Sequence, residues 1–132
     1  MIATSRRLEL KLLLSVAAAA LLFPVAAMAH PSLVGANPAA NASVPRTATI
    51  TLSFSETLMP KLSGARLIMT GMPGMKNHPD MPMKAAASVG PDGKTIVVKA
   101  ASPLPAGSYR VDWHVVSSDT HRITGSHAFS VR

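Results

Sequence analysis

Two groups of side chains in this sequence could bind a transition metal. The first is a run of thioethers between residues 69 and 83, which holds five of the six methionines that follow residue 29, together with one histidine. Thioether sulfur is a soft, neutral ligand that suits Cu(I), and unlike a thiol it forms no disulfide in an oxidising compartment. The candidate ligands are Met69, Met72, Met75, His78, Met81 and Met83. The run predicts a Cu(I) or Ag(I) site, and the alternative of a packing role applies most to Met69, at the end of an expected strand.

The second group depends on where the mature chain begins. If His30 is the N-terminal residue, its α-amine and ring Nδ1 can chelate one metal ion. Pro31 has no N–H, so the next backbone nitrogen cannot join the chelate, and the remaining ligands must come from elsewhere. Asp119 and His121 can supply a carboxylate oxygen and an imidazole, because residues two apart in extended chain point the same way. Nitrogen and oxygen ligands of this kind favour Cu(II), although an Asp-x-His pair alone is a common chance pattern.

Residues 1–29 have the pattern of an export signal. A basic start leads into an apolar run over residues 12–27, and the small residues Ala27 and Ala29 frame a signal peptidase site. We therefore expect cleavage after Ala29 and export of the remaining chain. The alternatives are an uncleaved membrane anchor, a cut after Ala27, and a twin-arginine signal at Arg6 and Arg7, for which Glu9 is unfavourable.

Composition excludes several classes of protein. The chain has 132 residues, 13 Lys and Arg against 6 Asp and Glu, and no Cys, so cysteine nucleophiles, CxxC motifs and disulfides are absent. We expect one domain, residues 30–132, which is long enough to fold without a disulfide or a structural metal. Its basic residues are scattered along the sequence, and this arrangement gives little support to nucleic-acid binding.

The pattern after residue 29 is that of short β-strands. Residues 47–54 alternate strictly between apolar and polar, residues 94–100 are rich in β-branched side chains after a Pro-Asp-Gly turn, and strands are also expected over 109–115 and 126–131. Weaker strands are expected over 33–35 and 66–70, and the Pro- and Gly-rich segment 69–83 is expected to be an extended loop. The predicted fold is all-β, a small antiparallel Greek-key sandwich or barrel. Strand parity points His114 outward, as an exposed sheet residue rather than a ligand or a ligand's partner, and it makes His127 a partly buried structural residue.

Several of these segments together resemble the CopC/PcoC family of periplasmic copper-binding proteins. They are His30-Pro31, Phe54-Ser55-Glu56, residues 69–75 and residues 109–126, and the resemblance extends over essentially all of residues 30–132. It implies a β-sandwich of seven or eight strands with two separate copper sites. Carried over by position, the Cu(II) ligands are His30, Glu56, Asp119 and His121. The Cu(I) ligands are among Met69, Met72, Met75, His78 and Met81, with Met83 an additional thioether.

The function expected from this resemblance is that of a non-enzymatic copper carrier. It would hold Cu(I) and Cu(II) in the periplasm and pass copper to an inner-membrane copper transporter and other periplasmic copper proteins, as a monomer or as a copper-bridged dimer. One alternative is an oxidative enzyme with an N-terminal histidine brace, although the single Trp and single Tyr are both expected to face inward. Another is an envelope interaction module whose metal binding is incidental.

Overall fold

The computed structural model describes residues 30–132, so the predicted signal peptide and its cleavage site lie outside the described residues. The strands run in chain order as follows: β1 (Leu33–Asn37), β2 (Ser43–Val44), β3 (Thr49–Phe54), β4 (Gly64–Gly71), β5 (Met81–Pro82), β6 (Ala85–Val89), β7 (Thr95–Ala100), β8 (Gly107–Val116) and β9 (Arg122–Val131). A three-residue 3-10 turn, η1 (Pro60–Leu62), precedes β4. Within residues 30–132, no helix has the length and apolar character needed to cross a bilayer.

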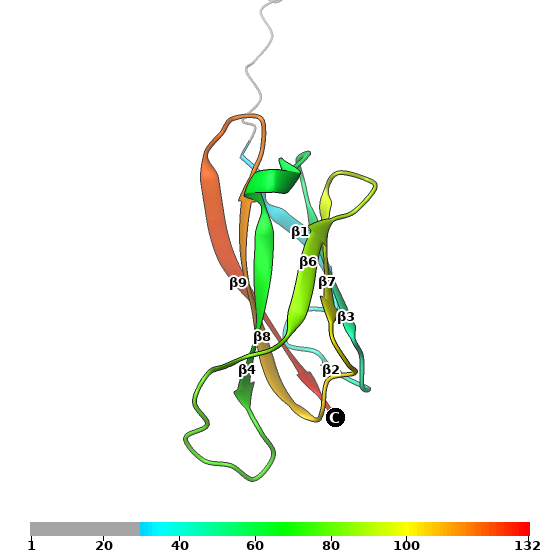
Figure 1. Cartoon of the computed structure of the whole chain (residues 1–132), viewed down its shortest axis with the longest axis vertical. Helices are drawn as coiled ribbons and strands as arrows, with labels where there is room; N and C mark the ends of the chain where they lie inside the picture. Colours follow the sequence, from blue (N-terminus) through cyan, green and yellow to red (C-terminus); the bar gives the residue numbers. More distant parts are fainter. Residues whose placement is uncertain (1–29) are drawn as a thin grey trace, which may run out of the picture.

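The strands form a two-layered β-sandwich (Figure 1). One sheet has the order β1-β3-β7-β6 and the other the order β2-β9-β8-β4-β5. All of the pairings between these strands are antiparallel except that of the two-residue β2 with the end of β9, which is parallel. The expectation of an all-β sandwich is confirmed, with this short parallel pair as a local departure from the antiparallel arrangement.

The core lies between the two sheets and follows the period-two alternation of the sequence. In β3 every second residue is fully buried, and in β8 Tyr109, Val111, Trp113 and Val115 all point inward. The Trp113 ring contacts Phe54 edge-on, with ring centroids 5.0 Å apart, and occupies the space that a Cβ on Gly125 would fill. The sequence patterns in these strands are therefore explained by burial of one face of each sheet.

Three strands were not predicted, and four strands are longer than predicted, β9 by the most. The missed strands β2 and β5 have two residues each, and β6 is an alanine-rich edge strand with no alternation of apolar and polar side chains. Strand β9 begins at Arg122, four residues before the expected start, because its pairing with β8 continues as far as Val116. Segment 69–83 is a loop only in its middle, since its ends belong to β4 and β5.

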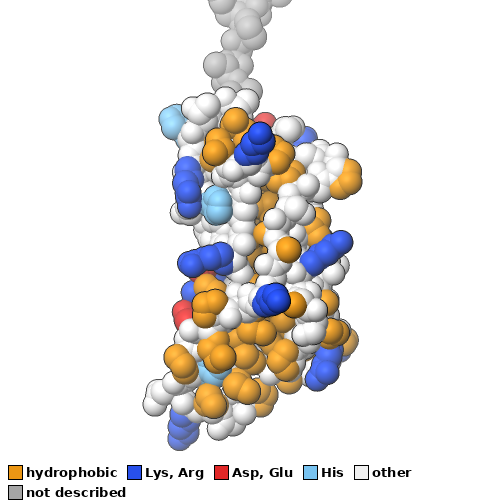
Figure 2. Space-filling view, in the orientation of Figure 1, with side chains coloured by type: hydrophobic (Ala, Val, Ile, Leu, Met, Phe, Trp, Pro, Cys, Tyr) orange, Lys and Arg blue, Asp and Glu red, His pale blue; other side chains and the backbone are white. Residues whose placement is uncertain are grey.

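The two groups of candidate ligands lie at opposite ends of the long axis of the sandwich (Figure 1). The β8–β9 connection and the start of the described chain are at one end, and the connection from β4 to β5 projects from the other. Lys and Arg side chains are distributed along the face shown in Figure 2, where few Asp or Glu side chains are visible.

Candidate metal sites

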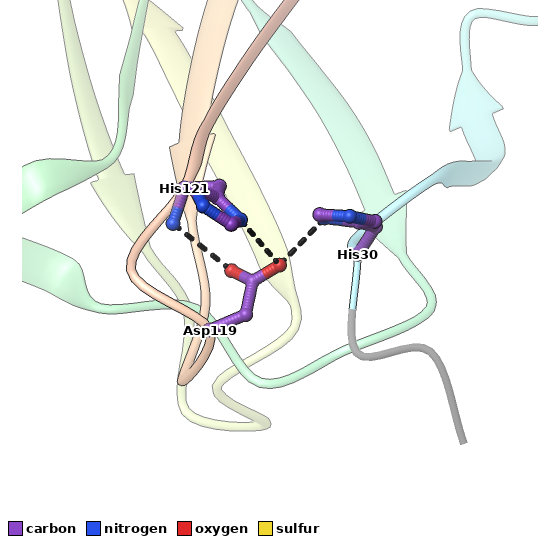
Figure 3. Close-up of side chains that lie close together, drawn as sticks. All are labelled: His30, Asp119 and His121. Carbon is purple, nitrogen blue, oxygen red and sulfur yellow. Dashed lines mark hydrogen bonds and ion pairs between the residues drawn. The ribbon is translucent and has the colours of Figure 1, made fainter. Parts of the chain in front are cut away.

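Three predicted ligands meet where the β8–β9 connection lies beside the start of the described chain. His30, Asp119 and His121 each offer a ligand atom, and these atoms all lie within 4.8 Å of one another (Figure 3). The Nδ1 atom of His30 is 2.6 Å from Oδ2 of Asp119, and the Nδ1 atom of His121 is 3.7 Å from the same oxygen. The two imidazole rings are 5.4 Å apart between centroids. Two imidazole nitrogens and one carboxylate oxygen form a donor set suited to a Cu(II) ion.

The tight connection between β8 and β9 holds the Asp119 carboxylate in place. The backbone turns at residues 117–120, where the Thr120 N–H donates to the Ser117 carbonyl at 3.0 Å. Oδ1 of Asp119 accepts hydrogen bonds from the Ser117 hydroxyl and the His121 N–H, both at 3.1 Å. Oδ2 faces the two imidazoles. It is buried and makes no aligned hydrogen bond with the described residues. One oxygen fixes the carboxylate and the other is available to a metal.

Thr120, in this turn, has an unfavourable backbone conformation. Its φ is +63°, in the left-handed region that β-branched residues rarely occupy. The conformation brings the chain back so that the His121 N–H meets the carboxylate of Asp119. Strain of this kind is characteristic of sites where geometry is imposed by the surrounding fold.

The electrostatics of the site favour the carboxylate anion. Partial burial raises the pKa of Asp119, but hydrogen bonds from the His121 N–H and the Ser117 hydroxyl lower it, as do the charges of His30 and His121. The net effect holds the pKa below its usual value of 3.8. Asp119 is therefore ionised at neutral pH, the form in which a carboxylate binds a metal.

The N-terminal segment is clamped against the turn that follows β3. Ser55 donates its N–H to the Ser32 carbonyl at 2.9 Å, and its hydroxyl accepts the Ser32 N–H at 3.0 Å. This clamp lies two residues from His30 and one residue from Glu56. Glu56 is partly exposed and does not belong to the cluster of ligand atoms that the described residues form. The structure therefore brings together three of the four predicted Cu(II) ligands and leaves Glu56 beside the clamp.

At the opposite end of the sandwich, a β-turn presents two methionines to solvent. The Met75 N–H donates to the Met72 carbonyl at 3.2 Å, with Pro73 and Gly74 between them, and Gly74 has a φ of +75°. Pro followed by Gly at positive φ is typical of a type II turn, which brings its first and last Cα atoms to within about 7 Å. The Met72 and Met75 side chains are 42% and 53% exposed. The turn thus holds two thioethers near each other on an open surface.

The remaining loop candidates differ in burial. Both ring nitrogens of His78 are buried without a hydrogen-bond partner among the described residues, so they lack the interaction that buried polar atoms normally have. Met81 is 47% exposed and lies directly opposite Met69 in the β4–β5 pair. Met69 is packed in the core, with its methyl group close to Gly107, and Met83 is half-buried against the core. Met69 was the candidate ligand for which the sequence also indicated a packing role, and the structure places its side chain in the core.

Comparison with known proteins identifies the family. Residues 33–132 match the CopC domain. The chain belongs to the CopC domain family. It is 53% identical over 115 residues to copper resistance protein C of Pseudomonas syringae pv. tomato, covering 87% of this chain and 90% of that protein. It is also 52% identical over 106 residues to copper resistance protein C of Escherichia coli, covering 80% and 84%.

Solved structures agree with this assignment. PcoC, a methionine-rich copper resistance protein from Escherichia coli, matches with a TM-score of 0.73 and 50% identity over 79% of this chain and all of that one. CopC from Methylosinus trichosporium OB3b matches with a TM-score of 0.64 and 27% identity over 77% and 93%. The resemblance stated from the sequence is therefore confirmed, together with the β-sandwich fold.

Two histidines of this CopC domain lie outside both clusters. His127 is buried, and its Nε2 is 2.8 Å from the Pro38 carbonyl, so it ties β9 to the segment between β1 and β2. This contact is the structural role that strand parity predicts. His114 is partly exposed on the outer face of the five-stranded sheet, its ring lying over Gly64.

The sequence alone did not reveal the residues that support the candidate ligands. Ser117 holds Asp119, and Ser32 and Ser55 clamp the N-terminal segment. Arg110 connects Asp80, on the loop, to Asp112 on β8, with contacts of 3.1 and 2.8 Å. A Ser two residues before an Asp in a loop is a recognisable signal for Ser117, whereas the Ser32–Ser55 and Arg110–Asp80 contacts join residues far apart in sequence.

Proposed function

We propose that this protein is a copper carrier of the bacterial periplasm that binds Cu(II) and Cu(I) at separate sites and has no enzymatic activity. The main support for this proposal is that the fold brings His30 next to Asp119 and His121, which lie about 90 residues later in the chain. One carboxylate oxygen of Asp119 faces both imidazole rings. Relatives named copper resistance protein C, about half identical in sequence, support copper as the ion. The protein would serve copper resistance and homeostasis by sequestering copper and delivering it.

The proposed Cu(II) site consists of His30, Glu56, Asp119 and His121. Exposure supports a role in exchange, because the His30 and His121 side chains are 44% and 71% exposed and so accessible to an incoming or outgoing ion. Cleavage after Ala29 would add the α-amine of His30 to the donor set. Glu56 would need to turn toward the cluster to complete it.

The proposed Cu(I) site lies in the methionine loop. Its ligands are drawn from Met72, Met75, His78 and Met81, with Met69 and Met83 as neighbouring thioethers. The exposed turn methionines and the unpartnered nitrogens of His78 support this assignment, since a soft cation would bind the sulfurs and also satisfy a buried nitrogen. Copper delivery would proceed to an inner-membrane copper transporter or another periplasmic copper protein, by a monomer or by a dimer bridged through copper.

The burial of aromatic side chains favours a carrier over an oxidative enzyme acting on a polymer. Trp113 and Tyr109, which the sequence placed on an inward face, are 9% and 1% exposed, and Phe54 and Phe129 are also buried. Within residues 30–132 there is therefore no exposed Phe, Tyr or Trp with which to build the flat aromatic surface that such a substrate would need.

A pair of variants tests whether the two copper ions use different sites. Exported protein that retains Ala29 has an amide in place of the His30 amine, and it should lose Cu(II) affinity while keeping Cu(I) affinity. A variant with Met72, Met75 and Met81 changed to Leu keeps side-chain volume and apolarity, and it should do the reverse. Each intact site should stabilise the fold by about 4 kcal/mol at a thousandfold excess of ion over Kd, which raises Tm by roughly 15 to 30 °C in a domain of this size.

Thermal shifts and quenching of the single described tryptophan, Trp113, by paramagnetic Cu(II) provide the readouts. Full Cu(II) stabilisation in the protein that retains Ala29, or full Cu(I) stabilisation in the triple Leu variant, would contradict the two-site proposal. Intact mass of the exported protein, with and without copper, fixes the start of the chain and the number of ions bound.

A further inference from the structure

The outer face of the five-stranded sheet carries a trough that neither copper site uses. It has a volume of about 540 Å³ and lies across β4, β8 and β9. Its lining includes six side chains on the outward parity of these strands: Arg66, Asp112, His114, Arg122, Thr124 and Ser126. Figure 2 shows basic side chains above and below a histidine on this side of the molecule.

The strand register explains how these side chains come to share one hollow. Arg66, Asp112 and Ser126 form one row across the three strands, and Gly64, His114 and Thr124 form the next. Because Gly64 has no Cβ, the His114 ring lies over β4, with Cε1 3.2 Å from the place a Cβ would take. The lining of the trough therefore combines the His114 ring with guanidinium and hydroxyl groups from the three strands.

The trough has an excess of positive charge. Asp112 is its one acidic residue, and its carboxylate already pairs with Arg110, which approaches it at 2.8 and 3.2 Å. Among the described residues, neither the Arg66 nor the Arg122 guanidinium group has an ion-pair or hydrogen-bond partner. Burial, and then the charge of Arg122, lower the pKa of His114. Two guanidinium groups, with two hydroxyls beside them, are thus free to bind an anion.

We propose that this trough docks an acidic, extended segment of a partner protein. Guanidinium groups bind carboxylates through two parallel hydrogen bonds, which provides both strength and orientation. Arg66 and Arg122 are two strands apart and their paired positions on β8 are four residues apart, so ideal sheet spacing separates their Cα atoms by about 16 Å. Two carboxylates four residues apart on an extended segment span about 13 Å, and flexible arginine side chains cover the difference.

The shape of the trough also favours a polypeptide over a small anion. A small ligand is held tightly when a cavity buries most of its surface, and an open trough on a sheet face offers no such enclosure. A segment that reaches both arginines gathers several contacts at once. Because Arg122 directly follows His121, the docked segment would lie alongside the proposed Cu(II) site and bring the partner to the exchangeable ion. The docking itself does not depend on copper.

A labelled peptide tests the docking directly. The probe is an eight-residue peptide of Ser and Thr with blocked ends and Glu at its second and sixth positions, and the matched probe has Gln at both. Fluorescence anisotropy at about 50 mM salt, below the ionic strength that screens exposed charges strongly, should show binding of the Glu probe by the exported protein and none of the Gln probe. Changing Arg66 and Arg122 together to Gln should weaken binding at least tenfold.

The control removes two positive charges away from the trough, one on β7 and one just before β6. Lys84 and Lys99 are exposed and remote from the trough, so the Lys84→Gln, Lys99→Gln variant should bind the Glu probe within about twofold of the unmodified protein. Equal losses in the two double variants, or no binding of the Glu probe at 1 mM, would overturn the proposal. Displacement of the probe by millimolar inorganic phosphate would identify a small-anion site instead. Binding to vesicles with 30% anionic lipid that both double variants weaken equally would identify general attraction to membranes.

Discussion

Replacing Thr120 with Gly should make the copper-free protein more stable and weaken Cu(II) binding at the proposed site. Thr120 lies between the two ligands of the β8–β9 turn at a φ of +63°. Glycine adopts this conformation without steric cost, whereas a residue with a Cβ does not. The strain is local, because no other turn residue between β8 and β9 has a positive φ.

The magnitude follows from two opposing effects. A left-handed conformation costs a residue with a Cβ about 1 to 2 kcal/mol, and that cost disappears in the glycine variant. Glycine also gives the unfolded chain more freedom, which costs about 0.4 to 1 kcal/mol. The net gain should be about 0.5 to 1 kcal/mol, or roughly 2 to 8 °C in Tm for a domain of about 100 residues. Cu(II) affinity should fall a few-fold, because the turn that presents Asp119 and His121 becomes less rigid.

Thermal unfolding with and without Cu(II) measures both effects on one sample. The matched control is Thr124→Gly, at an exposed position inside β9 where φ is not positive, which should lower stability by about 0.5 to 1 kcal/mol. A Thr120→Ala variant should lie close to the unmodified protein, since it keeps the Cβ. If Thr120→Gly lowered Tm as much as Thr124→Gly does, the turn would not be strained and the reasoning would fail.

Two further predictions follow from the ion pairs. Changing Asp80 to Asn removes the link from the methionine loop to Arg110, and because both side chains are substantially exposed, Tm should change by no more than about 2 °C. Cu(I) affinity, measured by competition with a Cu(I) chelator, should nevertheless fall about two- to fivefold, because the loop loses its anchor on β8; unchanged affinity would show that the anchor does not position the ligands. The lowered pKa of Asp119 means that its contribution to stability is present above the unfolded value near 3.8 and is lost as the pH falls through the folded value. Metal-free Tm should therefore fall less steeply below about pH 5 in Asp119→Asn than in the unmodified protein, and parallel curves would contradict the assignment.

The long central strands could be predicted because burial of one face dictates their sequence. Strand β3 and the inward residues of β8 alternate as a half-buried sheet requires, and their burial matches that alternation. The alanines of β6 do not, because alanine occupies both the exposed Ala85 and Ala86 and the half-buried Ala87, so apolar and polar residues do not alternate. The two-residue strands β2 and β5 are too short to carry any period and form only because their neighbours lie alongside.

The candidate sites were predictable to the extent that their ligands are chemically distinctive. An Asp-x-His pair and an N-terminal His could be recognised, and the structure brings His30, Asp119 and His121 together. Which loop sulfurs are exposed could be predicted only in part: the position of Met69 at the end of a strand indicated packing, but the sequence did not distinguish the half-buried Met83 from the exposed Met72 and Met81. The contacts that support the ligands could not be predicted either. They join residues distant in sequence, and they form only once all the strands have paired in register.

The separation of the candidate ligands along the sandwich has a physical consequence for copper handling. Asp119 is fixed by two hydrogen bonds inside a strained turn, so the proposed Cu(II) site would resist a change in coordination geometry. The turn at Met72 and Met75 is exposed and attached to the sheet face through one partly solvated ion pair, so its thioethers can rearrange around a soft ion. At the Asp119 end the protein would therefore set the coordination geometry, whereas at the methionine end the ligands would adjust to the geometry that the ion prefers. A partner held in the trough beside His121 would have access to the first end alone, and this arrangement would let the oxidation state of copper decide which partner receives it.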